Sequence, residues 1–256
     1  LNKLKSELKE NTPFWLQKLN ELECYISLAN FSFLNPDYTF PEICEDEKGK
    51  FESVKLGHPL IKREVKICND FSMNKENEIL IITGSNMSGK STFLKSIGVN
   101  MCLANAGAPV NADHLKISLF ELFTCIKVND SVSDGISYFY AEVKRLRELL
   151  DEFSNERHLP VFFLIDEIFK GTNNKERLEG SRAYIKRLSE LNGCGAVTTH
   201  DLELVHLADE ISRITNYHFR EEIENGKMVF DYLLHEGPCP TTNALRIMEL
   251  SGLPVK

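Results

Sequence analysis

The seven cysteines of this chain include no C-x-x-C pair. They are scattered, and several lie within apolar runs, so neither a zinc site nor a set of disulfides is expected, and the thiols are expected to be reduced in a cytoplasmic protein. No apolar stretch approaches the roughly 20 residues of a membrane-spanning helix, which excludes a transmembrane segment and a signal peptide from this sequence. Internal repeats and low-complexity tracts are also missing.

Acidic residues outnumber basic ones, so the formal net charge is −8 at pH 7. Binding of duplex nucleic acid depends largely on neutralising phosphates, so a broad nucleic-acid surface is not expected here. Basic residues at 144–147 and 182–187 form helix faces of a kind that is usually only solvated. The sequence starts at Leu1 rather than at Met, and we expect a fragment of a longer protein or an engineered piece.

The most informative segment reads GSNMSGKST and fits the phosphate-binding pattern G-x-x-x-x-G-K-[ST]. An apolar strand is expected before it at 78–83, and a helix after it at 90–104. The two glycines let the backbone N–H groups turn toward phosphate oxygens, the lysine adds a positive charge, and the following serine hydroxyl can bind Mg²⁺. The pattern therefore predicts a nucleoside triphosphate site made of Gly84, Ser85, Asn86, Met87, Ser88, Gly89, Lys90, Ser91 and Thr92.

A second apolar run, at 161–165, ends in Asp166 and Glu167. This is typical of a central parallel strand that delivers acidic side chains at its carboxyl end. We expect Asp166 to hold Mg²⁺, directly or through water, and Glu167 to polarise the attacking water. Seen alone, the two carboxylates could also be caps of the next helix, but beside a phosphate loop we favour the catalytic interpretation.

A third strand, at 194–198, is followed by Thr199 and His200. A histidine here can contact the γ-phosphate or the water, although a lone histidine is more often a structural hydrogen-bonding group. We favour the functional interpretation, because these side chains arrive at the same sheet edge as the carboxylates. The catalytic candidates are therefore Lys90, Glu167 and His200.

Taken together, GSNMSGKST, IDEIFKGTNN at 165–174 and TTH at 198–200 resemble the ATPase domain of the MutS mismatch-repair family, within the ABC-type ATPases. The resemblance covers roughly residues 50–254. It extends to the segments GHPL at 57–60, ND at 69–70, VNA at 110–112 and DGISYFYAE at 134–142.

The resemblance implies a Mg²⁺-dependent ATPase that forms a homodimer when ATP binds. In that arrangement Ser137 contacts the γ-phosphate held by the other protomer, although it can also cap its own helix. Asn69 and His218 are the candidates for the adenine side; a histidine within a strand, however, is more often structural. DNA would be bound by domains that are not in this sequence.

The departures from the family pattern are as informative. The family usually has Pro and Gly where this chain has Ser85 and Ser88, Gly-Arg where it has Phe169 and Lys170, and Ser at Asn173. The segment 237–244 also differs, and no mismatch-reading domain is present. These differences leave the phosphate chemistry intact and indicate a divergent branch.

The fold expected is α/β, a P-loop NTPase of the ABC-type class, with a mostly parallel sheet, helices on both faces and an antiparallel flank. We assign residues 1–50 to a helical segment plus linker, from the end of a core or lever region, and 51–256 to the ATPase domain. The first helix is expected to stop at Asn11, with Thr12 as the N-cap of the next helix and Pro13 at its first position. Strands are expected near 51–56, 64–68, 78–83, 121–128, 161–165, 194–198, 214–219 and 228–234, and helices at 90–104, 138–155, 175–191, 201–207 and 242–251.

Two functional classes are compatible with these patterns. The first is an ATP-driven DNA-repair machine, in which ATP closes a dimer and hydrolysis reopens it to gate DNA binding. The second is a nucleotide-gated scaffold or binding module outside mismatch repair, in which turnover is incidental. Glu167 and His200 favour the first class, whereas the substitutions at 169, 170 and 173 favour the second.

Overall fold

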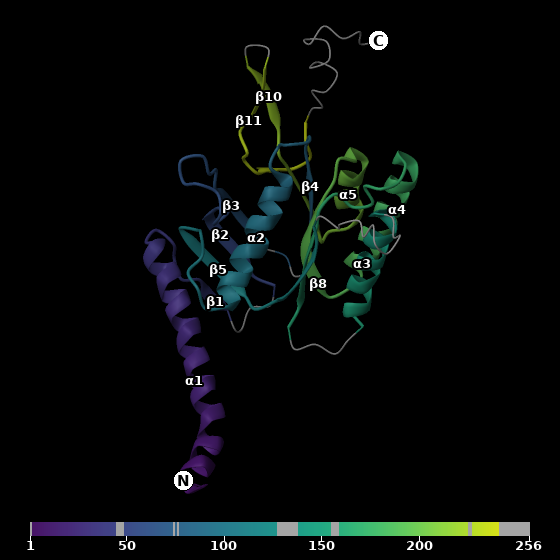
Figure 1. Cartoon of the computed structure of the whole chain (residues 1–256). Coiled ribbons are helices and arrows are strands. Elements are labelled where there is room, and N and C mark those ends of the chain that lie inside the picture. The colour runs from purple at the N-terminus through teal and green to yellow at the C-terminus, as the bar shows by residue number, and fades with distance from the viewer. Residues whose placement is uncertain are drawn as a thin grey trace, which may run out of the picture.

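The computed structural model describes residues 2–44, 49–73, 75, 77–126, 138–154, 159–224 and 227–240 (Figure 1). Its strands are β1 (Glu42–Cys44), β2 (Phe51–Leu56), β3 (Asn69–Met73), β4 (Ile79–Thr83), β5 (His114–Ser118), β6 (Glu121–Cys125), β7 (Val161–Ile165), β8 (Gly193–Thr198), β9 (Ile214–His218), β10 (Glu221–Glu224), β11 (Lys227–Phe230) and β12 (His235–Glu236). Its helices are α1 (Asn2–Leu34), α2 (Lys90–Asn105), α3 (Tyr138–Glu152), α4 (Asn174–Ser189), the 3₁₀ turn η2 (Leu202–His206) and α5 (Leu207–Glu210).

The larger sheet has six strands in the order β12-β9-β4-β8-β7-β6. Strand β4 lies at its centre and pairs in parallel with β8 on one side and β9 on the other. Strands β8, β7 and β6 continue in parallel, whereas β12 runs antiparallel to β9. All residues of β4, β7 and β8 are buried, as is typical of strands covered on both faces. The carboxyl ends of these three strands therefore meet at one edge.

A second sheet has four strands in the order β1-β5-β2-β3. It is largely antiparallel, since β2 runs antiparallel to both β3 and β5, and only β1 and β5 are parallel. The expected α/β class is confirmed, but the sheets are mixed, and the molecule is not built on one mostly parallel sheet. The strands β10 and β11 form a separate antiparallel hairpin, which projects beyond the body in Figure 1.

Two hydrophobic cores cover the two faces of the larger sheet. Helix α2 lies between the sheets, where Phe93, Leu94 and Ile97 pack with alternate residues of β4 and with the smaller sheet. The remaining residues of β4, Ile79 and Ile81, face a second core formed with α3, α4 and α5 (Figure 1). The alternation of β4 between both cores fixes the position of the loop that connects it to α2.

Helix α1 differs from our expectation, because it continues through Pro13 as a single helix instead of ending at Asn11. The Thr12 hydroxyl does not cap a new helix and donates to the Leu8 carbonyl. Proline removes one backbone donor, but residues 8–20 are exposed, so water can satisfy the freed carbonyl. The long purple helix extends away from the body in Figure 1.

The strand expected at 64–68 is also wrong, since residues 63–65 form a turn, 66–68 are irregular and β3 begins only at Asn69. The Val65 N–H bonds to the Lys62 carbonyl, and the Val65 side chain is exposed. In the part of the chain that the structure describes, no helix combines the length and hydropathy needed to cross a lipid bilayer. The helix expected at 242–251 lies outside the described residues.

Candidate nucleotide site

The loop between β4 and α2 adopts a conformation that its glycines permit. Gly84 has φ +144° and Gly89 φ +114°, both in the region that disfavours side chains. A Cβ on Gly84 would lie 2.5 Å from the Phe219 carbonyl oxygen, so no larger residue fits there. Gly89 is the N-cap of α2, and no side chain of the described residues caps that end. The first N–H groups of α2 therefore remain available to an anion.

Lys90 is buried and lies over this loop. Its Nζ donates to the carbonyl oxygens of Gly84 over 2.8 Å and of Ser85 over 2.7 Å. Burial lowers the pKa of Lys90 to about 8, although the carboxylates of Glu167 and Asp166 oppose this shift. A cation held at the phosphate loop in this way can exchange the carbonyl groups for phosphate oxygens.

Asp166 follows β7 and lies beside the first turn of α2. Its Oδ1 accepts hydrogen bonds from the Ser91 hydroxyl over 2.9 Å and from the Thr198 hydroxyl over 2.8 Å. Ser91 and Asp166 thus bring two oxygen atoms together beside the first turn of α2. Such a pair suits Mg²⁺, which binds one or two protein oxygens and completes its shell with water and phosphate. Among the described residues, no group of three or more His, Cys, Asp or Glu side chains could hold a metal alone.

Glu167 lies in the left-handed region, with φ +55°. Its N–H donates to the Thr198 hydroxyl over 2.8 Å, its Oε1 lies 2.6 Å from His200 Nε2, and its Oε2 forms an ion pair with Lys170. Burial alone would raise the pKa of Glu167, but the hydrogen bonds from Lys170 and His200 outweigh it and lower that pKa. The carboxylate therefore stays ionised, as a proton acceptor requires.

His200 connects Glu167 with the phosphate loop. Its Nδ1 lies 2.9 Å from the Gly84 carbonyl oxygen, in addition to the Nε2 contact with Glu167. The next residue, Asp201, accepts two hydrogen bonds of 2.7 Å each from Arg177 of α4. This bidentate pair fixes the segment that follows β8 and with it the position of His200.

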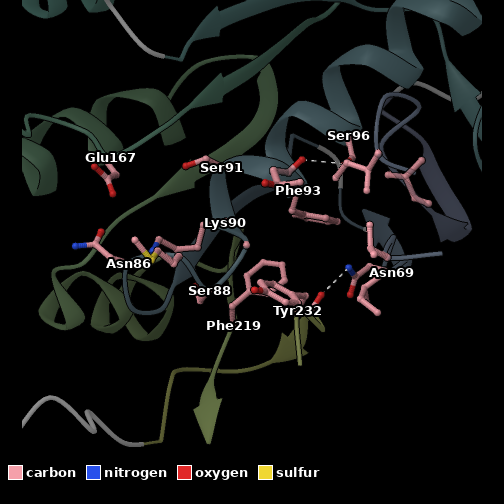
Figure 2. A pocket seen from close by; sticks show the side chains of 17 residues that line it. Asn69, Asn86, Ser88, Lys90, Ser91, Phe93, Ser96, Glu167, Phe219 and Tyr232 are labelled. Carbon is pink, nitrogen blue, oxygen red and sulfur yellow. Dashed lines mark hydrogen bonds between the residues drawn. The ribbon is translucent and has the colours of Figure 1, made fainter. Parts of the chain in front are cut away.

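The cavity beside these groups has a volume of about 430 Å³. Figure 2 shows Glu167 at one end and Asn69 with Tyr232 at the other, with Lys90 and Ser91 between them. Seven of the nine predicted loop residues line it, namely 86–92, as do Glu167 and Asn69. Such a volume is within the usual range of small-molecule sites.

The end of the cavity far from Glu167 holds Asn69 and Tyr232 (Figure 2). The apolar residues Ile61, Val65 and Ile67 also line the cavity. Asn69 holds this end in place, since its Nδ2 donates to the Tyr232 carbonyl and its Oδ1 accepts the Leu234 N–H. Apolar side chains and an aromatic residue thus line a cavity beside the loop between β4 and α2.

Two further sequence-based candidates, His218 and Ser137, stay predictions. His218 is buried in β9, where its Nδ1 lies 2.9 Å from the Gly237 carbonyl and its ring stacks on His235. The lining residues do not include it, and its role at the base stays a prediction. Ser137 lies outside the described residues.

Sequence reasoning missed several residues of this site. Thr198 stands within the TTH motif, which was a usable signal for it. Lys170 and Tyr232 carried no signal as site residues, because Lys170 reaches Glu167 only through the turn, and Tyr232 reaches the loop only through the return of the chain after β11.

Comparison with known proteins relates this chain to one family of DNA mismatch repair proteins. Residues 80–256 match the sequence family described as MutS domain V. The chain is 28% identical over 265 residues to the DNA mismatch repair protein MutS of Geobacillus thermodenitrificans, covering 98% of this chain and 28% of that protein. It is 29% identical over 262 residues to the protein of the same name from Listeria monocytogenes, covering 97% and 30%. For that of Lactobacillus johnsonii the values are 30% over 263 residues, 99% and 30%. The chain thus spans less than a third of the length of these relatives.

Proposed function

The chain belongs to the MutS domain V family, and on this basis together with the geometry of its cavity we propose that it binds ATP with Mg²⁺ and hydrolyses it. The observation that carries the proposal is the meeting of four groups around the loop between β4 and α2. Lys90 lies over the phosphate loop, Ser91 bonds to Asp166, and Glu167 lies beside them. Within the ABC-type ATPase class these groups serve phosphate binding, metal binding and water activation.

The triphosphate is bound by the loop and by α2. Its negative charge meets the Lys90 ammonium group and the uncapped N-terminus of α2. Lys90 leaves its two carbonyl partners for phosphate oxygens when the nucleotide enters. Ser91 and Asp166 would hold Mg²⁺, which when bound neutralises charge on the phosphates.

The water that attacks the γ-phosphate is oriented by Glu167. This carboxylate is ionised, lies at the phosphate end and contacts His200, which in turn contacts the loop carbonyl of Gly84. His200 thereby fixes the distance between the Glu167 carboxylate, which is the general base, and the phosphate loop.

The adenine base of the nucleotide occupies the end of the cavity far from Glu167. There Tyr232 offers a ring for stacking (Figure 2), and Val65 and Ile67 are apolar residues of the same cavity lining. Asn69 supports the backbone that carries Tyr232. The Tyr232 variants below test whether the base stacks on this ring.

At the level of the whole protein, we propose a cytoplasmic MutS-like DNA-repair protein. ATP closes a homodimer through the ATPase faces, with Ser137 completing the partner's site, and closure gates DNA held by other domains. A second candidate is a nucleotide-gated scaffold outside mismatch repair. The ion pair between Lys170 and Glu167 favours it, because a carboxylate paired with a lysine ammonium group is a weaker base and slows turnover.

Isothermal titration with Mg²⁺ and a non-hydrolysable ATP analogue tests the proposal, combined with phosphate release from ATP. We expect binding and release by the wild-type protein, and loss of both in Lys90→Ala. Equal affinity in this variant would refute the assignment of the loop. Tight binding without any release by the wild type would instead support the scaffold.

A further inference from the structure

Glu142 of α3 is a buried carboxylate outside the cavity, with an exposed fraction of only 2%. Its Oε1 accepts the backbone N–H of Phe169 over 2.6 Å. Among the described residues, Oε2 has no hydrogen-bond partner. Burial raises the pKa of Glu142, although the N–H groups of Phe169 and Lys170 oppose this shift. Burying a carboxylate that is only partly hydrogen-bonded costs free energy of folding. We therefore asked which part of the structure this contact stabilises.

What it holds is the turn that carries Glu167. Two residues of this turn that are not glycine, Glu167 and Phe169, lie in the left-handed region, with φ values of +55° and +56°. Such backbone persists only where its surroundings restrain it. Thr198 bonds to the N–H of Glu167 at the start of the turn, and Glu142 bonds to the N–H of Phe169 two residues later.

The side chain of Phe169 adds a second restraint. Its ring lies 6.4 Å from that of Phe139 in α3 and 6.1 Å from that of Tyr184 in α4, measured between ring centroids. Gly180 of α4 faces the same ring, and a Cβ there would lie 3.5 Å from it. Phe169 is thus held by its backbone and its ring between two helices, and Lys170, which follows it, reaches Glu167.

We propose that Glu142 is a positioning residue, which holds the Glu167 carboxylate at the phosphate end of the cavity by fixing the N–H of Phe169. This inference deepens the proposed hydrolysis of ATP and depends on it. Glu142 is not among the residues that line the cavity, and its hydrogen bond is to Phe169, so its loss acts on the turn between β7 and α4. The effect should therefore appear in the chemical step and not in nucleotide binding.

Three variants test this inference. Glu142→Leu removes the acceptor for Phe169, whereas Glu142→Gln keeps an oxygen in the same place. Glu78→Leu is the matched control, because Glu78 is also buried and also accepts a backbone N–H, from Lys75, but lies at the opposite end of β4. We expect kcat to fall about tenfold or more in Glu142→Leu, with KM for ATP within about twofold of the wild type. Kcat should stay within about threefold in Glu142→Gln and in Glu78→Leu.

The backbone contact is measured separately, by amide hydrogen exchange of ¹⁵N-phenylalanine-labelled protein. We expect slow exchange at Phe169 in the wild type and in Glu142→Gln, even if Glu142→Leu does not fold. Fast exchange at Phe169 in the wild type would overturn the inference. So would wild-type kcat in Glu142→Leu, or an equal loss of kcat in Glu78→Leu. If the wild type releases no phosphate at all, the proposed hydrolysis fails and the positioning role with it, whereas the exchange result still shows whether the contact exists.

Discussion

Thr198 donates its hydroxyl hydrogen to Asp166 and accepts the N–H of Glu167, over 2.8 Å in both cases. A single buried hydroxyl on β8 therefore orients both acidic residues that follow β7. Removing a hydrogen bond to a charged group costs about 1.5–3 kcal/mol. We expect Thr198→Val to lower kcat for ATP by about tenfold or more, while Thr198→Ser retains most of it.

The control for this variant is Thr215→Val, which removes a hydroxyl that bonds to Glu78 and lies away from the carboxylates. Steady-state phosphate release at saturating ATP gives kcat for all three proteins. A fall of the same size in Thr215→Val would assign the effect to stability instead of orientation.

Glu167→Gln separates binding from chemistry. The amide keeps the size of the side chain but cannot accept a proton, so we expect turnover to fall about 10²-fold or more while the ATP analogue still binds. The trapped ATP state should also favour the dimer. Turnover at the wild-type rate would show that another group polarises the water.

Tyr232 should determine affinity for the base and leave affinity for phosphate unchanged. Stacking of a base on an aromatic ring is worth about 1–3 kcal/mol, so we expect Tyr232→Ala to weaken ATP binding by about tenfold. Tyr232→Phe keeps the ring and should bind normally. Competition by tripolyphosphate, which has no base, should be the same in all three proteins. A parallel loss of tripolyphosphate binding would place Tyr232 at the phosphate end.

Lys90 gives nucleotide binding a pH dependence. Its pKa in the empty site is about 8, so its charge is present below that pH and is lost as the pH rises through it. Bound phosphates stabilise the ammonium form, and binding at pH 8 should therefore take up about half a proton per site. Titration calorimetry in buffers of different ionisation enthalpy measures this uptake. Uptake that is no larger at pH 8 than at pH 7 would contradict the assignment.

Assembly can be tested by mixing two inactive chains. If Ser137 completes the partner's site, Ser137→Arg should block the nucleotide bound by its partner, and Lys90→Ala should empty its own site. A mixed dimer then keeps one intact site, made from the nucleotide loop of the Ser137→Arg chain and the Ser137 of the other chain. We expect partial recovery of activity on mixing, and activity per chain that rises with protein concentration. No recovery, with concentration-independent activity, would exclude a shared site.

The phosphate loop and the carboxylates were predicted from the sequence, and their positions were predictable because they follow buried strands. Runs such as Val161–Ile165 are apolar throughout, and their ends define where Asp166 and Glu167 lie. Helix α2 and most strands of the larger sheet were found for the same reason. Their hydrophobic periodicity is local and strong.

Other features depended on contacts between distant parts of the chain. The short strands β1 and β5 escaped prediction because they are defined by pairing with each other and with β2. The continuation of α1 through Pro13 depends on exposure to water, which the sequence does not state. Three contacts at or near the site form only in the folded chain. Lys170 reaches Glu167 through the turn after β7, and Tyr232 reaches Asn69 through the return of the chain after β11. Glu142 reaches Phe169 from helix α3. The sequence alone determined which chemical groups stand at the ends of buried strands, because that pattern is local. Only the tertiary structure decided what restrains those groups, because each restraint joins residues that the chain places far apart or in a turn with no periodicity.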